Sequence, residues 1–428
     1  MTASLNPKQR RAAAVAAFAG NLVVWYDFAL YGYLASQLGQ AVFPDNSPQL
    51  RLLASFGVFA VGFLMRPVGS VVLGPLGDLL GRRLLLSVCT VIMGVSCLLI
   101  ALLPTHAQLG LLATTALVLL RMLQGVAVGA DLTGSISTAT EAAGNANAGL
   151  LSSLVVAGGH LGFCLSSLVV GLTSLAVQSS ALEPDWAWRF PFLLGALATA
   201  VGLWMRQRMP ETLPPLAQTP AFTRPLALFQ AIVRHLREAL GQWRLGLQVI
   251  ALVSFANVCF YQGFFYLVDV TAQRSGATFA ANTIATLVQG IGLLLALAGG
   301  LLVDRFGMVP VNRWGTLAML LVTPLAMHIG QQGTLVALTA ALGLLVGPVM
   351  VSMGALGALG AVLVPPRQRC AVFSIAYALA SALFAGTTPL VSSWLTALHA
   401  DWAVPLYALP YGCAALIAID ASRHAVLR

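Results

Sequence analysis

Apolar segments of about twenty residues recur along the whole chain, and they restrict its fold more than any other feature. Of the 428 residues, 59% are hydrophobic and only 8% are charged, whereas a soluble globular protein carries about 25% charged residues. A helix needs about twenty apolar residues to cross a bilayer. The sequence therefore predicts an all-α polytopic membrane protein. Its twelve predicted spans lie near residues 12–38, 52–77, 83–103, 109–139, 149–177, 188–206, 245–270, 279–303, 313–330, 334–363, 370–397 and 402–422.

The positive charges, which give a net charge of +9, concentrate in alternate connections between the spans. Arginines crowd the long middle connection, whereas the connections on the opposite side hold only Arg51, Arg189 and Arg274. By the positive-inside rule, this distribution predicts that both termini and the middle connection are cytoplasmic. The basic character therefore indicates membrane topology and not nucleic-acid binding, and we expect the plasma membrane, the inner membrane of a bacterium, as the location.

A short internal repeat predicts that the chain has two halves. The stretches GPLGDLLG and GGLLVDRFG both contain the pattern G-x-x-x-D-x-x-G, with Asp78 and Asp304 at the acidic position, and each follows the second span of its half. We expect six-helix halves at residues 1–206 and 245–428. The connection 207–244 is Pro-rich and then amphipathic, so it predicts a helix at the inner membrane surface or, alternatively, one packed on the helical bundle.

Several strings carry a resemblance to a known family. GNLVVWYDFALYG, FLMRPVGSVVLGPLGDLLGRR, RMLQGVAVGADLTG, STATEAAGNANAG and WAWRFPFLLG resemble the metabolite:proton symporter branch of the major facilitator superfamily, which transports citrate, tricarballylate, 2-oxoglutarate, shikimate and proline or betaine. The resemblance covers most of the chain. It implies twelve helices in two pseudo-symmetric six-helix halves, with a central cavity between them.

The sequence also departs from the pattern of that family. Val24 stands where the resembled proteins usually have glutamate, and Asp131 replaces another glutamate. Met308 and Val309 stand where two arginines are usual. The loss at Val24 bears on proton coupling and leaves the expected fold unchanged.

Charged and polar residues near the middle of the spans are candidates for transport chemistry. At about 1.5 Å per residue, Asp27, Arg121 and His160 fall near the membrane midplane. The resemblance implies that Asp27 faces a hydrated cavity and exchanges a proton, while Arg121 binds a substrate carboxylate. A structural ion pair between the two residues is the alternative. His160 either contacts substrate or titrates, or it is a structural histidine.

Further candidates belong to the cavity or to a cytoplasmic gate. The expected cavity residues are Asn21, Tyr31, Gln124, Asn257, Tyr261, Gln262 and Tyr377. Asp131 fits a gate or a proton exit, and Arg66 is expected either to pair with Asp131 or Glu141 or to extend toward the inner headgroups. The resemblance implies that Asp78 caps a helix of the other half and that Asp304 acts likewise. The other expected gate residues are Gly74, Gly81, Arg82, Arg83, Arg305 and Gly307.

We therefore predict a secondary active transporter of a small organic anion, a di- or tricarboxylate, by proton-coupled symport and alternating access. Uptake of a zwitterion or a carboxylate siderophore, efflux by proton antiport and a non-transporting solute sensor remain open as alternatives. The few residues after the last span favour an anion over the osmosensing proline/betaine type. The scattered histidines and the cysteines within spans indicate neither an enzyme nor a metal site, and we expect a monomer without cofactor.

Overall fold

The computed structural model describes residues 6–44, 48–143, 147–180, 182–212 and 225–426, and within these ranges the regular structure is helical. The helices of the first half are α1 (Pro7–Tyr33), α2 (Ala35–Val42), α3 (Pro48–Leu79), α4 (Arg82–Ala101), α5 (His106–Leu109), α6 (Leu111–Ala143), α7 (Ala148–Gln178), α8 (Pro184–Ala187) and α9 (Arg189–Arg208).

The connection between the halves contains α10 (Pro225–Gly241). The second half comprises α11 (Trp243–Tyr261), the π-helical segment η3 (Gln262–Leu267), α12 (Val268–Ser275), α13 (Thr278–Phe306), α14 (Met308–Gly330), α15 (Leu335–Leu363), the short η4 (Pro366–Gln368), α16 (Arg369–Ala380), the π-helical η5 (Ser381–Ala385), α17 (Thr388–Ala397), α18 (Ala403–Leu406) and α19 (Leu409–Val426).

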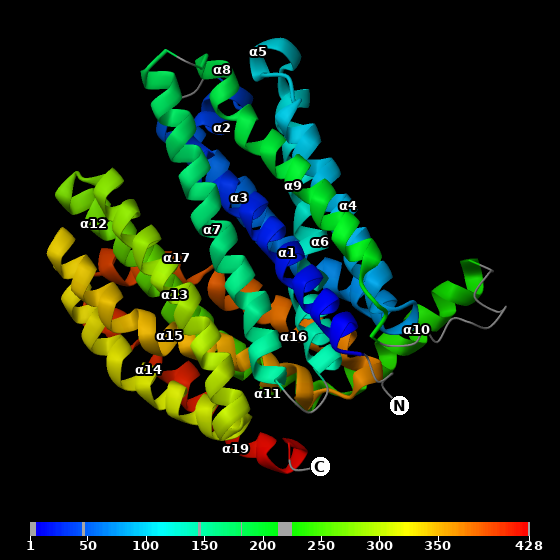
Figure 1. Cartoon of the computed structure of the whole chain (residues 1–428). Helices are drawn as coiled ribbons and strands as arrows, with labels where there is room; N and C mark the ends of the chain where they lie inside the picture. The colour runs from blue at the N-terminus through cyan, green and yellow to red at the C-terminus, as the bar shows by residue number, and fades with distance from the viewer. Residues whose placement is uncertain (1–5, 45–47, 144–146, 181, 213–224, 427–428) are drawn as a thin grey trace.

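Twelve membrane-length helical stretches follow the predicted spans closely. Ten of the described stretches are long and apolar enough to cross a membrane, and the long helices α9 and α14 lie beside them in the two bundles (Figure 1). The large apolar side chains that stay exposed, such as Leu172, Leu321 and Leu390, are those that a lipid environment would cover. The predicted all-α membrane fold is confirmed.

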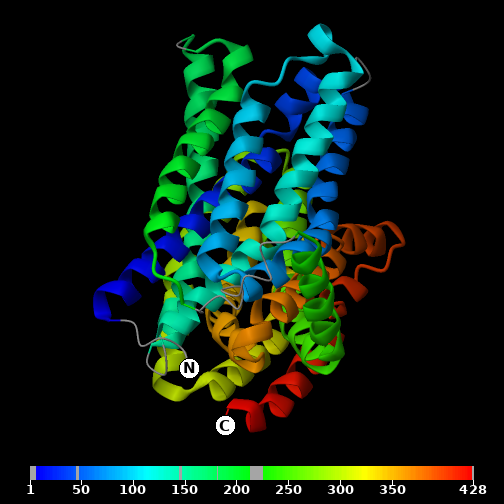
Figure 2. The same ribbon diagram turned by 90° about the vertical axis from the view of Figure 1, so that its right-hand side faces the viewer.

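The two bundles diverge at one end and approach each other at the end where both termini lie (Figure 1). We call this the termini end. Helices α3 and α7 of the first bundle pack against α16 and α13 of the second. Figure 2 shows α10 at the same end, where it contacts α3 of the first bundle and α16 of the second. Its buried seam consists of Ala231, His235 and Ala239, while apolar side chains such as Phe229 remain exposed.

Glycines allow the closest helix contacts inside each bundle. A Cβ atom at Gly69 in α3 would collide with the carbonyl oxygen of Val126 in α6, and one at Gly354 in α15 would collide with that of Ala296 in α13. Small residues at such positions let the backbones approach, which replaces the hydrophobic driving force that is missing between helices in lipid.

Replacing Gly69 with alanine is therefore expected to lower stability by about 1–3 kcal/mol, because the added methyl group forces α3 and α6 apart. Gly57, in the same helix, is the matched control, since nothing lies within 4 Å of the Cβ it would acquire. Thermal unfolding of the detergent-solubilised protein measures both variants. Equal melting temperatures for Gly69→Ala and Gly57→Ala would contradict the close-contact role.

Candidate functional site

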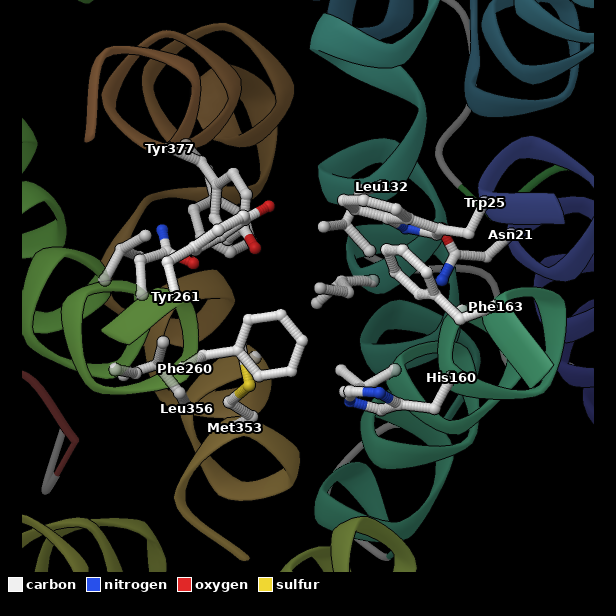
Figure 3. Close-up of a pocket in the computed structure, with 18 residues that line it drawn as sticks. Asn21, Trp25, Leu132, His160, Phe163, Phe260, Tyr261, Met353, Leu356 and Tyr377 are labelled. Carbon is white, nitrogen blue, oxygen red and sulfur yellow. The ribbon is translucent and has the colours of Figure 1, made fainter. Parts of the chain in front are cut away.

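A cavity lies between the two bundles, and both halves contribute to its walls. The first half supplies residues of α1, α6 and α7, and the second half supplies residues of α11, α15 and α16. Figure 3 shows Trp25, Leu132, Phe163 and His160 on one side, facing Tyr261, Tyr377, Phe260 and Met353 on the other. The space open to the centres of water molecules is about 70 Å³, so several waters or a small solute fit.

The walls are mainly aromatic, with a few polar groups. Their aromatic residues are Trp25, Phe163, Phe260, Tyr261, Phe373 and Tyr377. Three polar residues carry buried atoms without a hydrogen-bond partner, namely Oδ1 of Asn21, Nδ1 of His160 and Nδ2 of Asn257. Buried polar groups are normally paired, and here a bound solute can supply the partners. Apolar walls with a few polar groups are typical of small-molecule sites.

Four of the seven predicted cavity residues line this cavity, namely Asn21, Asn257, Tyr261 and Tyr377, and His160 of the midplane candidates lines it as well. Three others point elsewhere. Gln262 donates its Nε2 hydrogen to the carbonyl oxygen of Val404 at 2.9 Å, and Tyr31 stacks on Phe59. Gln124 is buried inside the first bundle. These three residues lie on helix faces that turn toward other helices.

Asp27 and Arg121 also lie away from the cavity, in the interior of the first bundle, which corrects the expectation that Asp27 faces a hydrated space. Both are fully buried. Gln124 connects them: its amide donates a hydrogen bond to the Asp27 carboxylate, and its Oε1 accepts one from Arg121 at 2.8 Å. Within the described chain this bridge takes the place of a direct ion pair. The Arg121 guanidinium lies 4.3 Å from the centre of the Tyr31 ring and 4.9 Å from that of Phe28.

Asp131 forms a buried ion pair that the sequence did not predict. Arg206 near the end of α9 donates to Oδ1 of Asp131 at 2.5 Å and to Oδ2 at 3.0 Å, and it also donates to the hydroxyl of Thr90. Both side chains are fully buried. Gly20 leaves the space for the guanidinium, because a Cβ there would collide with it. Arg206 is the last residue of the predicted span 188–206, and its partner is visible only after α6 and α9 are packed.

Arg66 forms neither of the two alternative ion pairs predicted for it. Asp131 is paired with Arg206, and Glu141 is paired with Arg82. Its buried guanidinium lies over aromatic rings instead, 4.1 Å from the ring centre of Phe63, 4.6 Å from Phe28 and 5.2 Å from Trp25. Arg66 is therefore not part of the contacts that close the termini end.

Two carboxylates join the bundles at the termini end. Asp78 at the end of α3 accepts hydrogen bonds from the backbone N–H groups of Cys370 and Ala371, at 3.0 and 2.9 Å, in the first turn of α16. Asp304 at the end of α13 accepts from those of Gly149 and Leu150, at 2.7 and 2.8 Å, in the first turn of α7. Each carboxylate thus caps a helix of the other half, where the positive end of the helix dipole stabilises it.

The Asp78 contact is reinforced by a buried charge network. Arg82 donates to Asp78 at 2.6 Å, to Glu141 at 2.9 Å and to the carbonyl oxygen of Pro366 in the second half at 2.8 Å. Arg369 of the second half also reaches Glu141, at 3.2 Å. The Asp304 contact has no such arginine among the described residues, in keeping with Met308 at the corresponding position.

The connection between the halves takes part in the same network, which the sequence did not indicate. His235 of α10 contacts Oδ2 of Asp78 at 3.2 Å. Glu211 accepts from the backbone N–H groups of Arg82 and Arg83 at the start of α4, and Thr212 donates to Glu141 at 2.8 Å.

The remaining predicted gate residues are divided between backbone roles and exposed positions. Gly81 and Gly307 adopt φ values of 105° and 92°, which favour glycine and allow the tight turn after each repeat. Gly74 packs against the backbone of Ala371. Arg83 and Arg305 have exposed side chains, and their guanidinium groups take no part in the closing contacts of the described residues.

Two membrane-spanning bundles around a central cavity define the architecture of a membrane transporter. The family model of the Major Facilitator Superfamily matches residues 13–385, and the chain belongs to this family. The relatives of this chain within the family are membrane transporters of small solutes and not enzymes. Among solved structures, a proton:xylose symporter bound to 6-bromo-6-deoxy-D-glucose shares the fold with a TM-score of 0.75 at 19% identity, over 98% of this chain and 96% of that one.

Individual relatives are transporters of zwitterions and of an organic anion. An ectoine/proline transporter of Corynebacterium glutamicum is 35% identical over 91% of this chain and 79% of its own length. The proline/betaine transporter of Escherichia coli K12 is 30% identical over 93% of this chain and 80% of its own. The alpha-ketoglutarate permease of the same strain is 30% identical, over 95% and 93%.

Proposed function

We propose that this protein is a proton-coupled transporter that takes up a small zwitterion with one carboxylate and one alkylated ammonium group, such as a betaine or an imino acid. The observation that carries the proposal is the aromatic cavity between the halves. Tyrosine, tryptophan and phenylalanine rings bind quaternary ammonium groups through cation–π attraction, and six such rings line this cavity.

The cavity favours this substrate class over the di- or tricarboxylate predicted from sequence. Its described lining contains no arginine or lysine, and His160 is its one ionisable nitrogen base. Two or three carboxylates would need several positive groups to replace their hydration, because an unpaired charge is costly to bury. The ectoine, proline and betaine relatives point to the same class.

Alternating access follows from the closure at the termini end, which we place in the cytoplasm on the basis of the arginine distribution. Asp78 and Asp304 each form hydrogen bonds to the other half. These hydrogen bonds must break when the protein opens to the cytoplasm. Asp27 is the proposed proton carrier. It is buried with Gln124 and Arg121, and protonation there would alter that network behind the cavity wall.

Uptake of labelled glycine betaine, proline and 2-oxoglutarate into proteoliposomes, with and without an inward proton gradient, tests the proposal. We expect gradient-stimulated uptake of glycine betaine or proline in the wild type. The gradient-driven uptake rate of Asp27→Asn is expected to be at least tenfold lower than that of wild type. The variant should still exchange external substrate for substrate preloaded into the proteoliposomes. Extrusion of a dye or drug without uptake of any of the three solutes would replace the proposal with efflux.

A further inference from the structure

We propose that Arg66 binds the carboxylate of the transported solute; this inference rests on the proposed function and assigns the residue that recognises the anionic group. Arg66 lies in the middle of α3, and only 3% of its surface is exposed. A buried guanidinium is normally paired with a carboxylate, because its desolvation is otherwise uncompensated. Within the described residues Arg66 has no such partner.

The missing partner is visible at the level of single atoms. Nε and Nη2 of Arg66 are buried without a hydrogen-bond acceptor. Its closest described neighbours are the rings of Phe63, Phe28 and Trp25, and none of the ion pairs among the described residues includes Arg66. Two unpaired N–H directions on one planar group are what bidentate recognition of a carboxylate requires.

The position of Arg66 relative to the cavity identifies the substrate as the source of that carboxylate. Trp25, whose ring the Arg66 guanidinium overlies, belongs to the cavity wall, and so does Tyr261, whose ring packs edge-on against the Phe63 ring beside that guanidinium. Figure 3 shows Tyr261 and Tyr377 of the second half facing Trp25 of the first across the cavity. A carboxylate bound between Trp25 and the two tyrosines would contact Arg66 of the first half and the phenol groups of the second. One group of the solute would then contact both bundles.

Arg121, the residue expected from sequence to hold the carboxylate, lacks this connection. Its guanidinium contacts Tyr31, Phe28 and Phe59, and none of these residues lines the cavity. Both guanidinium groups lie against Phe28, at 4.6 and 4.9 Å from its ring centre. Arg121 is therefore the less direct candidate, because it lies one step farther from the cavity and is hydrogen-bonded to Gln124 in the network that contains Asp27.

The test measures equilibrium binding of glycine betaine, 2-oxoglutarate and choline to the purified full-length protein. Trp25 lines the cavity, so its fluorescence is a suitable signal. We expect Arg66→Gln to weaken glycine betaine binding by roughly 10- to 150-fold, the range for hydrogen bonds to a charged group. Choline lacks the carboxylate, and its affinity should change less than threefold. Arg66→Lys should fall between wild type and Arg66→Gln.

The outcomes separate this inference from the proposed function. If wild type binds glycine betaine and Arg66→Gln and Arg66→Lys bind it equally well, the Arg66 assignment is wrong and the substrate class stands. If Arg66→Gln weakens the binding of betaine and of choline alike, the loss is structural and the assignment also fails. If wild type binds 2-oxoglutarate alone, in an Arg66-dependent manner, the zwitterion proposal fails and the assignment stands. Binding of no carboxylate at all would overturn both.

Discussion

Replacing Asp78 with asparagine is expected to open the termini-end contact and to reduce transport at least tenfold. Asp78 accepts hydrogen bonds from Arg82 and from the backbone N–H groups of Cys370 and Ala371. An amide keeps one oxygen but turns an NH2 group toward these donors. Hydrogen bonds to a charged group contribute about 1.5–3 kcal/mol, so the loss of about one such bond shifts the balance between the open and closed states by tenfold or more.

Cys370 provides a direct measurement of this opening. Its thiol is fully buried at the contact, so a maleimide applied from the termini side should label it faster in Asp78→Asn than in wild type, with the other five cysteines replaced by alanine. Asp304→Asn is the matched control and should have a smaller effect, because the exposed Asp304 lacks an arginine partner in the described structure. Unchanged labelling and normal transport in Asp78→Asn would rule out the closing role.

Replacing Asp131 with asparagine is expected to destabilise the protein by about 3–5 kcal/mol, because it leaves Arg206 buried without its counter-ion. Arg206→Met should have a similar cost. The double variant Asp131→Leu with Arg206→Met should recover most of the loss, since an apolar pair of similar volume often replaces a buried ion pair without penalty. Thermal unfolding in detergent measures all three variants.

The same variants distinguish a structural Asp131 from the proton exit predicted from sequence. A structural ion pair predicts that the double variant, once stable, keeps gradient-driven uptake. If Asp131→Asn folds with wild-type stability and loses only its response to the proton gradient, Asp131 titrates during transport and the structural interpretation is wrong.

The sequence predicted the structure best where a property, such as apolar character or a motif, repeats along the chain. The twelve spans, the amphipathic α10 and the two G-x-x-x-D-x-x-G turns were predicted close to their observed bounds, because helix length and apolar periodicity are local properties. Asn257, Tyr261 and Tyr377 were predicted to lie at the cavity, and they line it.

The face that each helix turns toward each neighbour depends on the packing of distant segments and could not be predicted from the pattern of the sequence. Arg121, Gln124 and Asp27 are turned into the first bundle, and Arg66 lies beside the cavity rather than in the closing contacts. The same holds for the pairing of Asp131 with Arg206 and for the approach of His235 to Asp78. In a chain that is apolar on nearly every helical face, the hydrophobic pattern cannot distinguish a face that meets lipid from one that meets protein. The sequence therefore determined the spans and the family resemblance, and packing between distant helices determined the charge partners.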